Sequence, residues 1–249
     1  MISVVARHEL RSLFLSPLAW LVLALIQLLL AYIFLLNIDG FIAGQEELAL
    51  KPDAPGATIL VVIKTLLNVP TVLMIVIPLI AMRLFSDEKR LQTRVLLLSS
   101  PVSMTSIVFG KYLALLVFFG LLWLLLALMS LSLSMAVSLD LGHISAALIA
   151  VLLFIVAVSA ISLFMSVMTS QAALAAFASF VLVLLLWIVD NASGVRSSES
   201  VLSHLSMSYH YQSLLSGFVR ISDVVYFCLL ALVFLLLTLH RLQLERKHG

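Results

Sequence analysis

Six long apolar stretches restrict what this chain can fold into. They lie at about 17–38, 60–82, 107–138, 143–168, 172–190 and 223–240. A helix needs roughly 20 apolar residues to cross the hydrocarbon core of a bilayer, and each stretch is close to that length or longer. The polar and apolar residues do not alternate with the period of a membrane β-barrel. The sequence therefore predicts an all-α polytopic membrane protein with six transmembrane helices, in a single domain over residues 1–249.

The composition excludes a soluble globular protein. Hydrophobic residues make up 63% of the chain and charged residues 10%, whereas soluble domains carry about 25% charged residues. The N-terminal apolar run is too long for a cleavable signal peptide and no A-x-A site follows it, so we expect it to remain as the first span. Cys228, the single cysteine, lies inside the last span and forms no internal disulfide. We interpret it as a small buried residue.

The basic residues are distributed unequally between the two sides of the predicted bundle. Six spans place both termini on one side, together with residues 83–111. Ten of the fourteen basic residues lie on that side: Arg7, Arg11, Arg83, Lys89, Arg90, Arg94, Lys111, Arg241, Arg246 and Lys247. The other four, Lys51, Lys64, Arg196 and Arg220, lie on the opposite side. Cytoplasmic loops carry an excess of Lys and Arg, so both termini are predicted to be cytoplasmic.

Residues 83–111 form a long charged passage between the second and third spans. Ser86 is predicted to cap a short helix whose first turn holds Asp87 and Glu88, because carboxylates suit the positive end of a helix. Pro101 disfavours helix at the preceding residue and is expected to end it. We therefore predict an amphipathic cytoplasmic helix at about 86–98, and we hypothesise that a partner protein pushes on it. The alternative is a solvated loop that only maintains the topology.

Residues 2–16 form a second predicted amphipathic helix. Arg7 and Arg11 share its polar arc, and Glu9 falls on the apolar side. A basic amphipathic helix lies in the membrane interface; the alternative is a frayed terminus that orients the first span. Ser16-Pro17 predicts that a new helix starts there.

The outer segment 191–222 is too long for a simple turn. It mixes apolar and polar residues, so we expect an interfacial or re-entrant helix. His204 and His210 have poor spacing for a metal site. Lys64, near the outer end of the second span, is a candidate functional charge, but we favour a lysine that extends to the lipid head groups. Pro70 and Pro78 are expected to kink that span.

Small and hydroxyl residues recur on three spans. In the fifth span they predict close helix packing, with a subunit interface as one possible location; they are Ala172, Ala173, Ala175, Ala176, Ala178 and Ser179. Serines share a face of the third span (Ser130, Ser134, Ser138) and of the fourth (Ser159, Ser162, Ser166). They would line a polar path or, as we favour, bond to their own or a neighbouring helix.

Several catalytic patterns do not occur. There is no G-x-x-x-x-G-K-[ST] nucleotide loop and no H-E-x-x-H zinc motif. The centres of the third to sixth spans hold no ionisable group of the kind that ion-coupled transporters use. We therefore predict a chain that is not an enzyme, binds no metal or cofactor, has no nucleic-acid partner, and takes energy from another protein.

The charged passage resembles the inner loop of type-2 ABC transporter permeases. The matching residues are Phe85, Asp87-Glu88-Lys89, Thr93, Leu96 to Ser103, Ile107 and Gly110-Lys111, with Gln92 and Arg94 where the family usually has glycine and glutamate. The start, Arg7-His8-Glu9-Leu10 with Phe14, Ser16-Pro17 and Leu18, is similar to the gliding-motility-associated branch. So is the end, with His210, Gly217, Asp223 to Phe227 and Leu244-Glu245-Arg246.

The resemblance implies two permease copies in a bacterial inner membrane, each resting on a cytoplasmic ABC ATPase that binds ATP and Mg²⁺. It assigns ATPase coupling to Phe85, Asp87, Glu88, Lys89, Arg90, Thr93, Arg94 and Leu97, and membrane bracing to the helix with Arg7, Glu9 and Arg11. ATP hydrolysis by the partner would then drive export of a substrate that the sequence does not identify. The alternative is an energy-transducing or scaffold subunit that acts on an outer-side auxiliary protein and translocates nothing.

Overall fold

The computed structural model describes residues 2–46, 55–90, 103–192 and 204–248, and within these ranges the chain is helical with no strand. The elements, in chain order, are α1 (Ile2–Leu15), α2 (Pro17–Ala43), the π-helix η1 (Thr58–Ile63), α4 (Lys64–Ala81), α5 (Arg83–Arg90), α7 (Met104–Ser132), the 3-10 turn η2 (Leu133–Met135), α8 (Leu141–Met168), α9 (Ala172–Ala192), α11 (Met207–Leu215) and α12 (Ile221–His248).

Six of these segments are long and apolar enough to cross a membrane, as predicted. They run Pro17–Ala43, Thr58–Ser86, Met104–Met135, Leu141–Met168, Ala172–Val189 and Ile221–Arg246. The predicted fold class is therefore confirmed. Boundaries differ most at the first and last spans, whose helices continue beyond the predicted ends at 38 and 240, because a helix does not stop where the apolar run stops.

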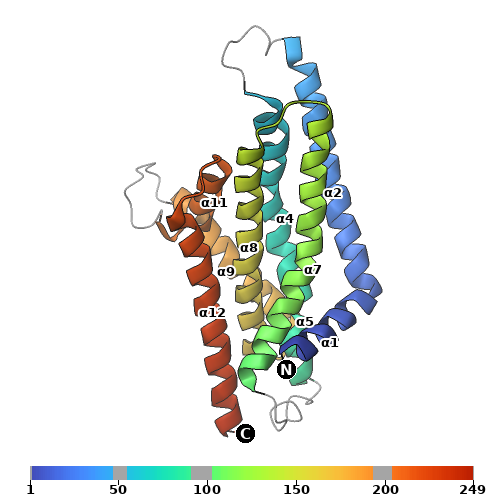
Figure 1. Cartoon of the computed structure of the whole chain (residues 1–249). Coiled ribbons are helices and arrows are strands. Elements are labelled where there is room, and N and C mark those ends of the chain that lie inside the picture. Colours follow the sequence, from blue (N-terminus) through green and yellow to red (C-terminus); the bar gives the residue numbers. More distant parts are fainter. Residues whose placement is uncertain (1, 47–54, 91–102, 193–203, 249) are drawn as a thin grey trace.

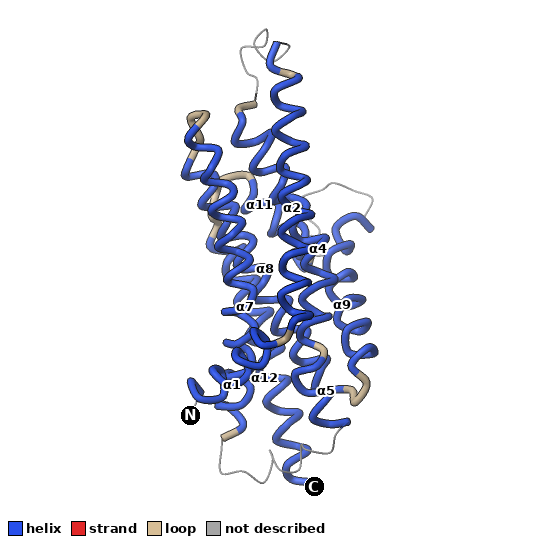
Figure 2. The backbone as a smooth tube through the Cα atoms, turned by 90° about the vertical axis from the view of Figure 1, so that its right-hand side faces the viewer, coloured by secondary structure: helices blue, strands red, loops and turns tan. Residues whose placement is uncertain are grey.

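The long helices run along one axis and successive ones point in opposite directions (Figure 1). Both termini and α5 lie at the lower end of that view, which we call the α5 end. The C-terminal end of α2, the turn between α7 and α8, and α11 lie towards the opposite end, the α11 end. Figure 2 shows α1 crossing the α5 end at an angle to the bundle axis. A separate helix starts at Pro17, as the Ser16-Pro17 pair predicts, and Ser16 itself is extended.

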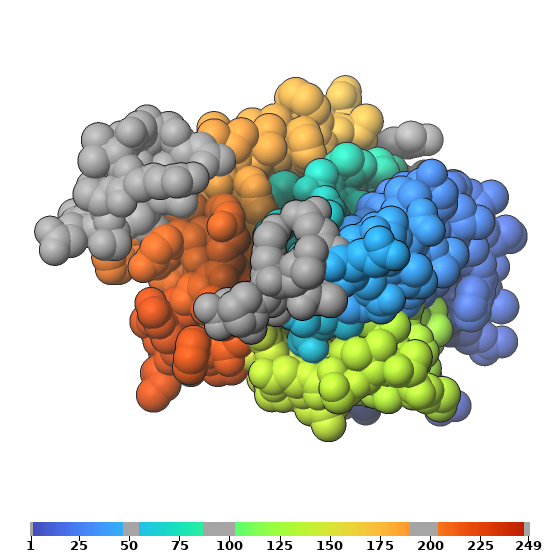
Figure 3. Space-filling view, turned by 90° about the horizontal axis from the view of Figure 1, so that it is seen from above, coloured from blue at the N-terminus to red at the C-terminus, as the bar shows by residue number. Residues whose placement is uncertain are grey.

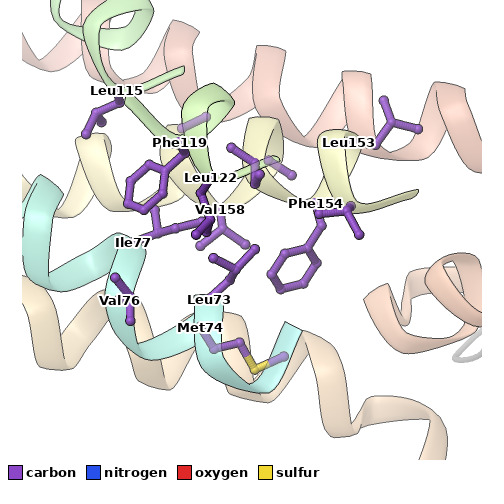
Figure 4. Packing of buried hydrophobic residues seen from close by; sticks show 14 of the residues in the cluster. Leu73, Met74, Val76, Ile77, Leu115, Phe119, Leu122, Leu153, Phe154 and Val158 are labelled. Atoms are coloured by element: carbon purple, nitrogen blue, oxygen red, sulfur yellow. The ribbon is translucent and has the colours of Figure 1, made fainter. Parts of the chain in front are cut away.

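The centre of the bundle is α8. It contacts α4, α5, α7, α9, α11 and α12. Of its most apolar 18-residue stretch, 67% is buried inside the bundle, whereas the corresponding share for α2 is 22%. Buried side chains from α4, α7 and α8 interlock there, including Leu73, Phe119 and Phe154 (Figure 4). An extended apolar core of this kind fixes the helices relative to one another, so a displacement of α8 affects most of the bundle.

The small residues of the fifth span are used inside the chain. Ala175, Ala176 and Ser179 are buried, whereas Ala173 is exposed. Close packing is thus present, but this face is covered by the chain's own helices, among which α9 contacts α4 and α8. The prediction that Ala175, Ala176 and Ser179 lie at a subunit interface is therefore wrong. The small side chains allow α9 to approach its neighbours in the same chain.

The serine hydroxyls divide into three groups. Ser130 donates to the carbonyl of Leu126 and Ser134 to that of Leu131, so both bond to their own helical segment. Ser166 bonds to the α4–α5 junction. The hydroxyls of Ser159 and Ser162 are buried without a hydrogen-bond partner among the described residues. The interpretation that these serines bond locally or to a neighbour thus holds for Ser130, Ser134 and Ser166.

The described part of the outer segment is folded into the bundle. Tyr211 of α11 is fully buried and donates through its hydroxyl to the carbonyl of Leu66, 2.7 Å away in α4. Burial raises the pKa of Tyr211, so the phenol remains a donor. The helix predicted in the outer segment is therefore present and packed on the bundle, and whether it is interfacial or re-entrant stays a prediction.

His210 has a structural role in this region. Its Nδ1 lies 2.7 Å from Asp223 Oδ1, and its ring stacks on Tyr226 with the centroids 4.1 Å apart. His143 of α8 bonds through Nε2 to the carbonyl of Leu215 (2.7 Å). Figure 3 looks down on the α11 end and shows orange α11 and the start of α12 beside the yellow-green turn between α7 and α8. Among the described residues no group of three or more His, Cys, Asp or Glu is placed to hold a metal ion.

Two predictions about the second span have different outcomes. Lys64 is exposed on the outside of the bundle, in agreement with a lysine that extends to the head groups. Pro70 and Pro78 both lie inside α4, which continues to Ala81. A kink at these prolines stays a prediction. The π-helix at the start of the span was not predicted.

Candidate functional site: the α5 junction

The helix that follows α4 begins earlier than predicted. It starts at Arg83, and its first turn holds no acidic residue. Ser86 is therefore not an N-cap: it lies inside α5 and is fully buried. The predicted cap is wrong because Leu84 and Phe85 continue the buried apolar face of α4. That places the Ser86 hydroxyl against α8, where it finds a tertiary partner instead of a local one.

Ser166 of α8 holds the junction between α4 and α5. Its hydroxyl accepts from the backbone N–H of Phe85 at 3.0 Å and donates to the carbonyl of Met82 at 2.9 Å. The Ser86 hydroxyl donates to the carbonyl of Ser166 at 3.1 Å. These bonds are buried, and a buried polar group that loses its partner costs about 1–3 kcal/mol. They join α5 to the central helix.

Lys111 of α7 joins α5 to α1. Its side chain is 2% exposed, and Nζ lies 2.6 Å from Glu9 Oε1 and 2.8 Å from the carbonyl oxygen of Leu84. The same ammonium group lies 4.9 Å from the centroid of the Phe85 ring, within the range of a cation–π contact. A buried charge needs such partners. Glu9 therefore lies on the apolar side of α1 because it neutralises Lys111.

Gly110 allows α1 to lie against α7. A Cβ built on Gly110 would come within 2.7 Å of the Val5 Cβ, a distance that real Cβ atoms do not show. The absence of a side chain at Gly110 thus permits the contact, and the next residue, Lys111, forms the ion pair that secures it. Phe14 of α1 extends the contact, with its ring 5.7 Å from that of Phe118.

The predicted coupling residues are only partly brought together. Phe85 is buried beneath Lys111. Asp87, Glu88, Lys89 and Arg90 form the end of α5, while Thr93, Arg94 and Leu97 lie outside the described residues. In α1, Arg7 and Arg11 are exposed and Glu9 faces the junction. The structure thus places Phe85 and Glu9 around one lysine.

The sequence does not predict the roles of three residues of the junction. It places Ser166 on a serine face and predicts Ser86 as a helix cap. It counts Lys111 only among the charges that set the topology and as part of a G-K pair. One signal was available for the ion pair, since an acid on the apolar face of a helix requires a buried partner. Nothing in the local sequence connects Ser86 to Ser166. The hydrogen bonds and the ion pair of the junction connect α1, α5, α7 and α8 to one another.

The chain matches one family model along nearly its full length. The model is described as ABC-2 family transporter protein, and the match covers residues 3–246. No curated protein matches the chain.

Proposed function

Because the chain belongs to the ABC-2 transporter family and is a membrane permease subunit of it, we propose that it couples ATP hydrolysis by a separate cytoplasmic ATPase to export of a substrate. Subunits of this type are typically non-catalytic, and the ATPase is a separate chain. ATP and Mg²⁺ are assigned to that ATPase. The family match also supports a pathway formed with a second permease copy. The similarity of the two chain ends to the gliding-motility-associated branch remains part of this proposal.

The observation that carries the proposal is the attachment of α5 to four helices. α5 continues α4, bonds through Ser86 to Ser166 of α8, and contacts Lys111 of α7 through Leu84 and Phe85. Lys111 extends the connection to Glu9 of α1. A displacement applied to α5 would move these elements together rather than bend a loop. A partner protein can transmit its motion to the bundle only through an element that moves as a unit between two discrete positions.

The proposed orientation places the α5 end in the cytoplasm. Both termini lie at that end (Figure 1), and the sequence predicts that ten of the fourteen basic residues lie on the side of the termini. This excess is the pattern that cytoplasmic loops follow. The membrane is proposed to be the bacterial inner membrane.

The charged end of α5 is the proposed contact with the ATPase. Asp87, Glu88, Lys89 and Arg90 end the described part of the helix, and Thr93, Arg94 and Leu97 are assigned to the same contact. Misplaced charges at an interface can cost several kcal/mol through like-charge contacts. Exchanging charges within α5 therefore tests the contact without changing net charge.

The decisive variant combines Glu88→Arg with Arg90→Glu. We expect normal abundance in the membrane and loss of ATPase association, or of the ATPase stimulation that the subunit provides. The matched control exchanges Arg241 and Glu245, an i,i+4 pair on α12 whose side chains are 44% and 20% exposed. This control should bind and stimulate the partner ATPase as the parent does. If the Glu88/Arg90 exchange binds and stimulates the ATPase as the parent does, α5 does not couple and the assignment fails.

A second experiment tests the orientation independently. In a Cys228→Ser background, single cysteines replace Glu46, Gln92 or Ser198. A membrane-impermeant thiol reagent should label the first and third in intact cells and Gln92→Cys only after the membrane is opened. Labelling of Gln92→Cys in intact cells would reverse the proposed topology.

An energy-transducing role without translocation is the second candidate. The bundle extends the connection to the α11 end, where Tyr211 bonds to Leu66 of α4 and packs with Phe154 and Trp187. The same motion would then reach an outer-side auxiliary protein. Reconstituted vesicles separate the two roles: accumulation of a substrate during ATP hydrolysis supports export, and ATPase stimulation only when an outer-side protein is present supports transduction.

A further inference from the structure

A cavity of about 680 Å³ lies at the α5 end, between α1, the first turns of α2, the last turns of α4, and Lys111 of α7. This volume is within the range of about 300–1,000 Å³ that small-molecule sites occupy. Its lining is divided in two. One part is polar, with His8 and Ser12 of α1 and Arg83 of α5; the other is apolar, with Leu21 and Val22 of α2 and Leu79 of α4.

Arg83 brings a positive charge to the polar part of the lining. Lys111 and Glu9 both line the cavity and neutralise each other at 2.6 Å. Arg83 is exposed and makes no ion pair among the described residues. An arginine guanidinium presents several N–H donors in a planar fork that fits a phosphate group. The hydroxyls of Ser12 and Ser16 lie in the same lining and are further donors.

The apolar part opens on the outer surface of the bundle. Leu21 is 59% exposed and Leu79 is 44% exposed, and both belong to segments long enough to cross a membrane. The cavity is therefore accessible from the region that lipid chains fill. A small soluble anion would contact only the polar part and would make no use of this apolar wall.

We propose that the cavity binds one anionic phospholipid from the leaflet nearest α1, with its phosphate at Arg83 and an acyl chain along Leu21 and Leu79. Arg83 begins α5 and Ser12 lies in α1, so the lipid contacts the same two elements that Lys111 joins through Leu84 and Glu9. The inference requires only that the long helices span a membrane. It does not depend on contact between α5 and an ATPase, and its test uses the subunit alone.

The binding test measures retained lipid by native mass spectrometry of the full-length chain purified in detergent. Phosphatidylglycerol is compared with phosphatidylcholine, and glycerol 3-phosphate serves as the soluble head group. The parent should retain one phosphatidylglycerol in preference to phosphatidylcholine, and glycerol 3-phosphate should not displace it. Arg83→Gln should weaken retention about tenfold, the lower range for a hydrogen bond to a charged group at an accessible site.

Arg11→Gln is the matched control for general attraction between a basic protein and anionic lipid. Arg11 is an exposed arginine at the same end that does not line this cavity, so its loss should leave retention unchanged. Equal weakening by both arginine variants, equal retention of both lipids, or displacement by glycerol 3-phosphate would each overturn the proposal.

A second pair of variants tests the apolar wall. Leu21→Trp adds bulk at the cavity opening and should reduce retention of phosphatidylglycerol. Leu25→Trp places the same side chain one turn further along α2, at a leucine that is also 59% exposed but is not part of the lining. It should retain lipid as the parent does. Unchanged retention in Leu21→Trp, with the protein folded, would show that the acyl chain does not lie there.

Discussion

The Lys111–Glu9 ion pair allows a quantitative prediction for the attachment of α1. Glu9→Ala removes the carboxylate 2.6 Å from Nζ and leaves an ammonium group that is 2% exposed. Removing one partner of a buried pair typically costs about 3–5 kcal/mol. Lys111 keeps its bond to the Leu84 carbonyl and its contact with Phe85, and the Glu9 side chain is itself 19% exposed. We therefore expect the lower limit, a loss of about 3 kcal/mol in the free energy of unfolding.

Equilibrium unfolding of the purified chain in mixed micelles with increasing SDS, followed by far-ultraviolet circular dichroism, measures this loss. Arg11→Ala is the control, because Arg11 lies on the exposed side of the same helix. It should change the free energy of unfolding by no more than about 0.5 kcal/mol. Glu9→Ala combined with Lys111→Met also removes the buried ammonium group of Lys111, so the double variant should be less destabilising than Glu9→Ala alone. If Glu9→Ala unfolds like Arg11→Ala, the ion pair does not hold α1 and the reasoning is refuted.

Three further predictions concern residues elsewhere in the bundle. Ser166→Ala removes the hydroxyl that accepts from the backbone N–H groups of Phe85 and Ser86 and donates to the Met82 carbonyl, and it should cost about 1–3 kcal/mol. Ser162→Ala, whose hydroxyl is buried without a partner among the described residues, should be neutral in the same unfolding assay. Gly110→Ala should destabilise the chain by about 1–3 kcal/mol because its Cβ overlaps Val5. Gly120→Ala meets nothing within 4 Å and should be neutral or stabilising, so equal effects of the two alanines would contradict the close contact. Tyr211→Phe leaves the Leu66 carbonyl unpaired and should cost about 1–3 kcal/mol; a value near zero would show that this bond does not hold α11.

Much of the architecture follows from the sequence because a bilayer imposes a local rule. An apolar run of sufficient length must satisfy its backbone hydrogen bonds internally, so it becomes a helix whatever surrounds it. The six spans and the shared end for both termini were predictable for this reason. The start of α2 at Pro17 was predictable because proline suits the first position of a helix. The amphipathic pattern of residues 2–16 also predicted α1 as a helix.

The candidate site depends on contacts that local patterns do not contain. Capping preference placed Ser86 at a helix start, but α8 supplies a carbonyl and a hydroxyl from Ser166, 80 residues away in the sequence. In the sequence Glu9 is an acidic residue on the apolar arc of its helix. Its partner Lys111 lies 102 residues away, and only the fold brings the two side chains together. Helix periodicity relates residues three or four apart, so it cannot state which helix faces which.

The sequence by itself thus determined that this chain spans a membrane with six helices. The reason is that an apolar segment long enough to cross a bilayer can satisfy its backbone hydrogen bonds only as a helix. Tertiary structure alone decided how α5 is held, why Lys111 is buried, and that α11 enters the bundle at Leu66. The physical reason is that burying a polar group is unfavourable without a partner. Only the packing of helices distant in sequence determines where that partner lies.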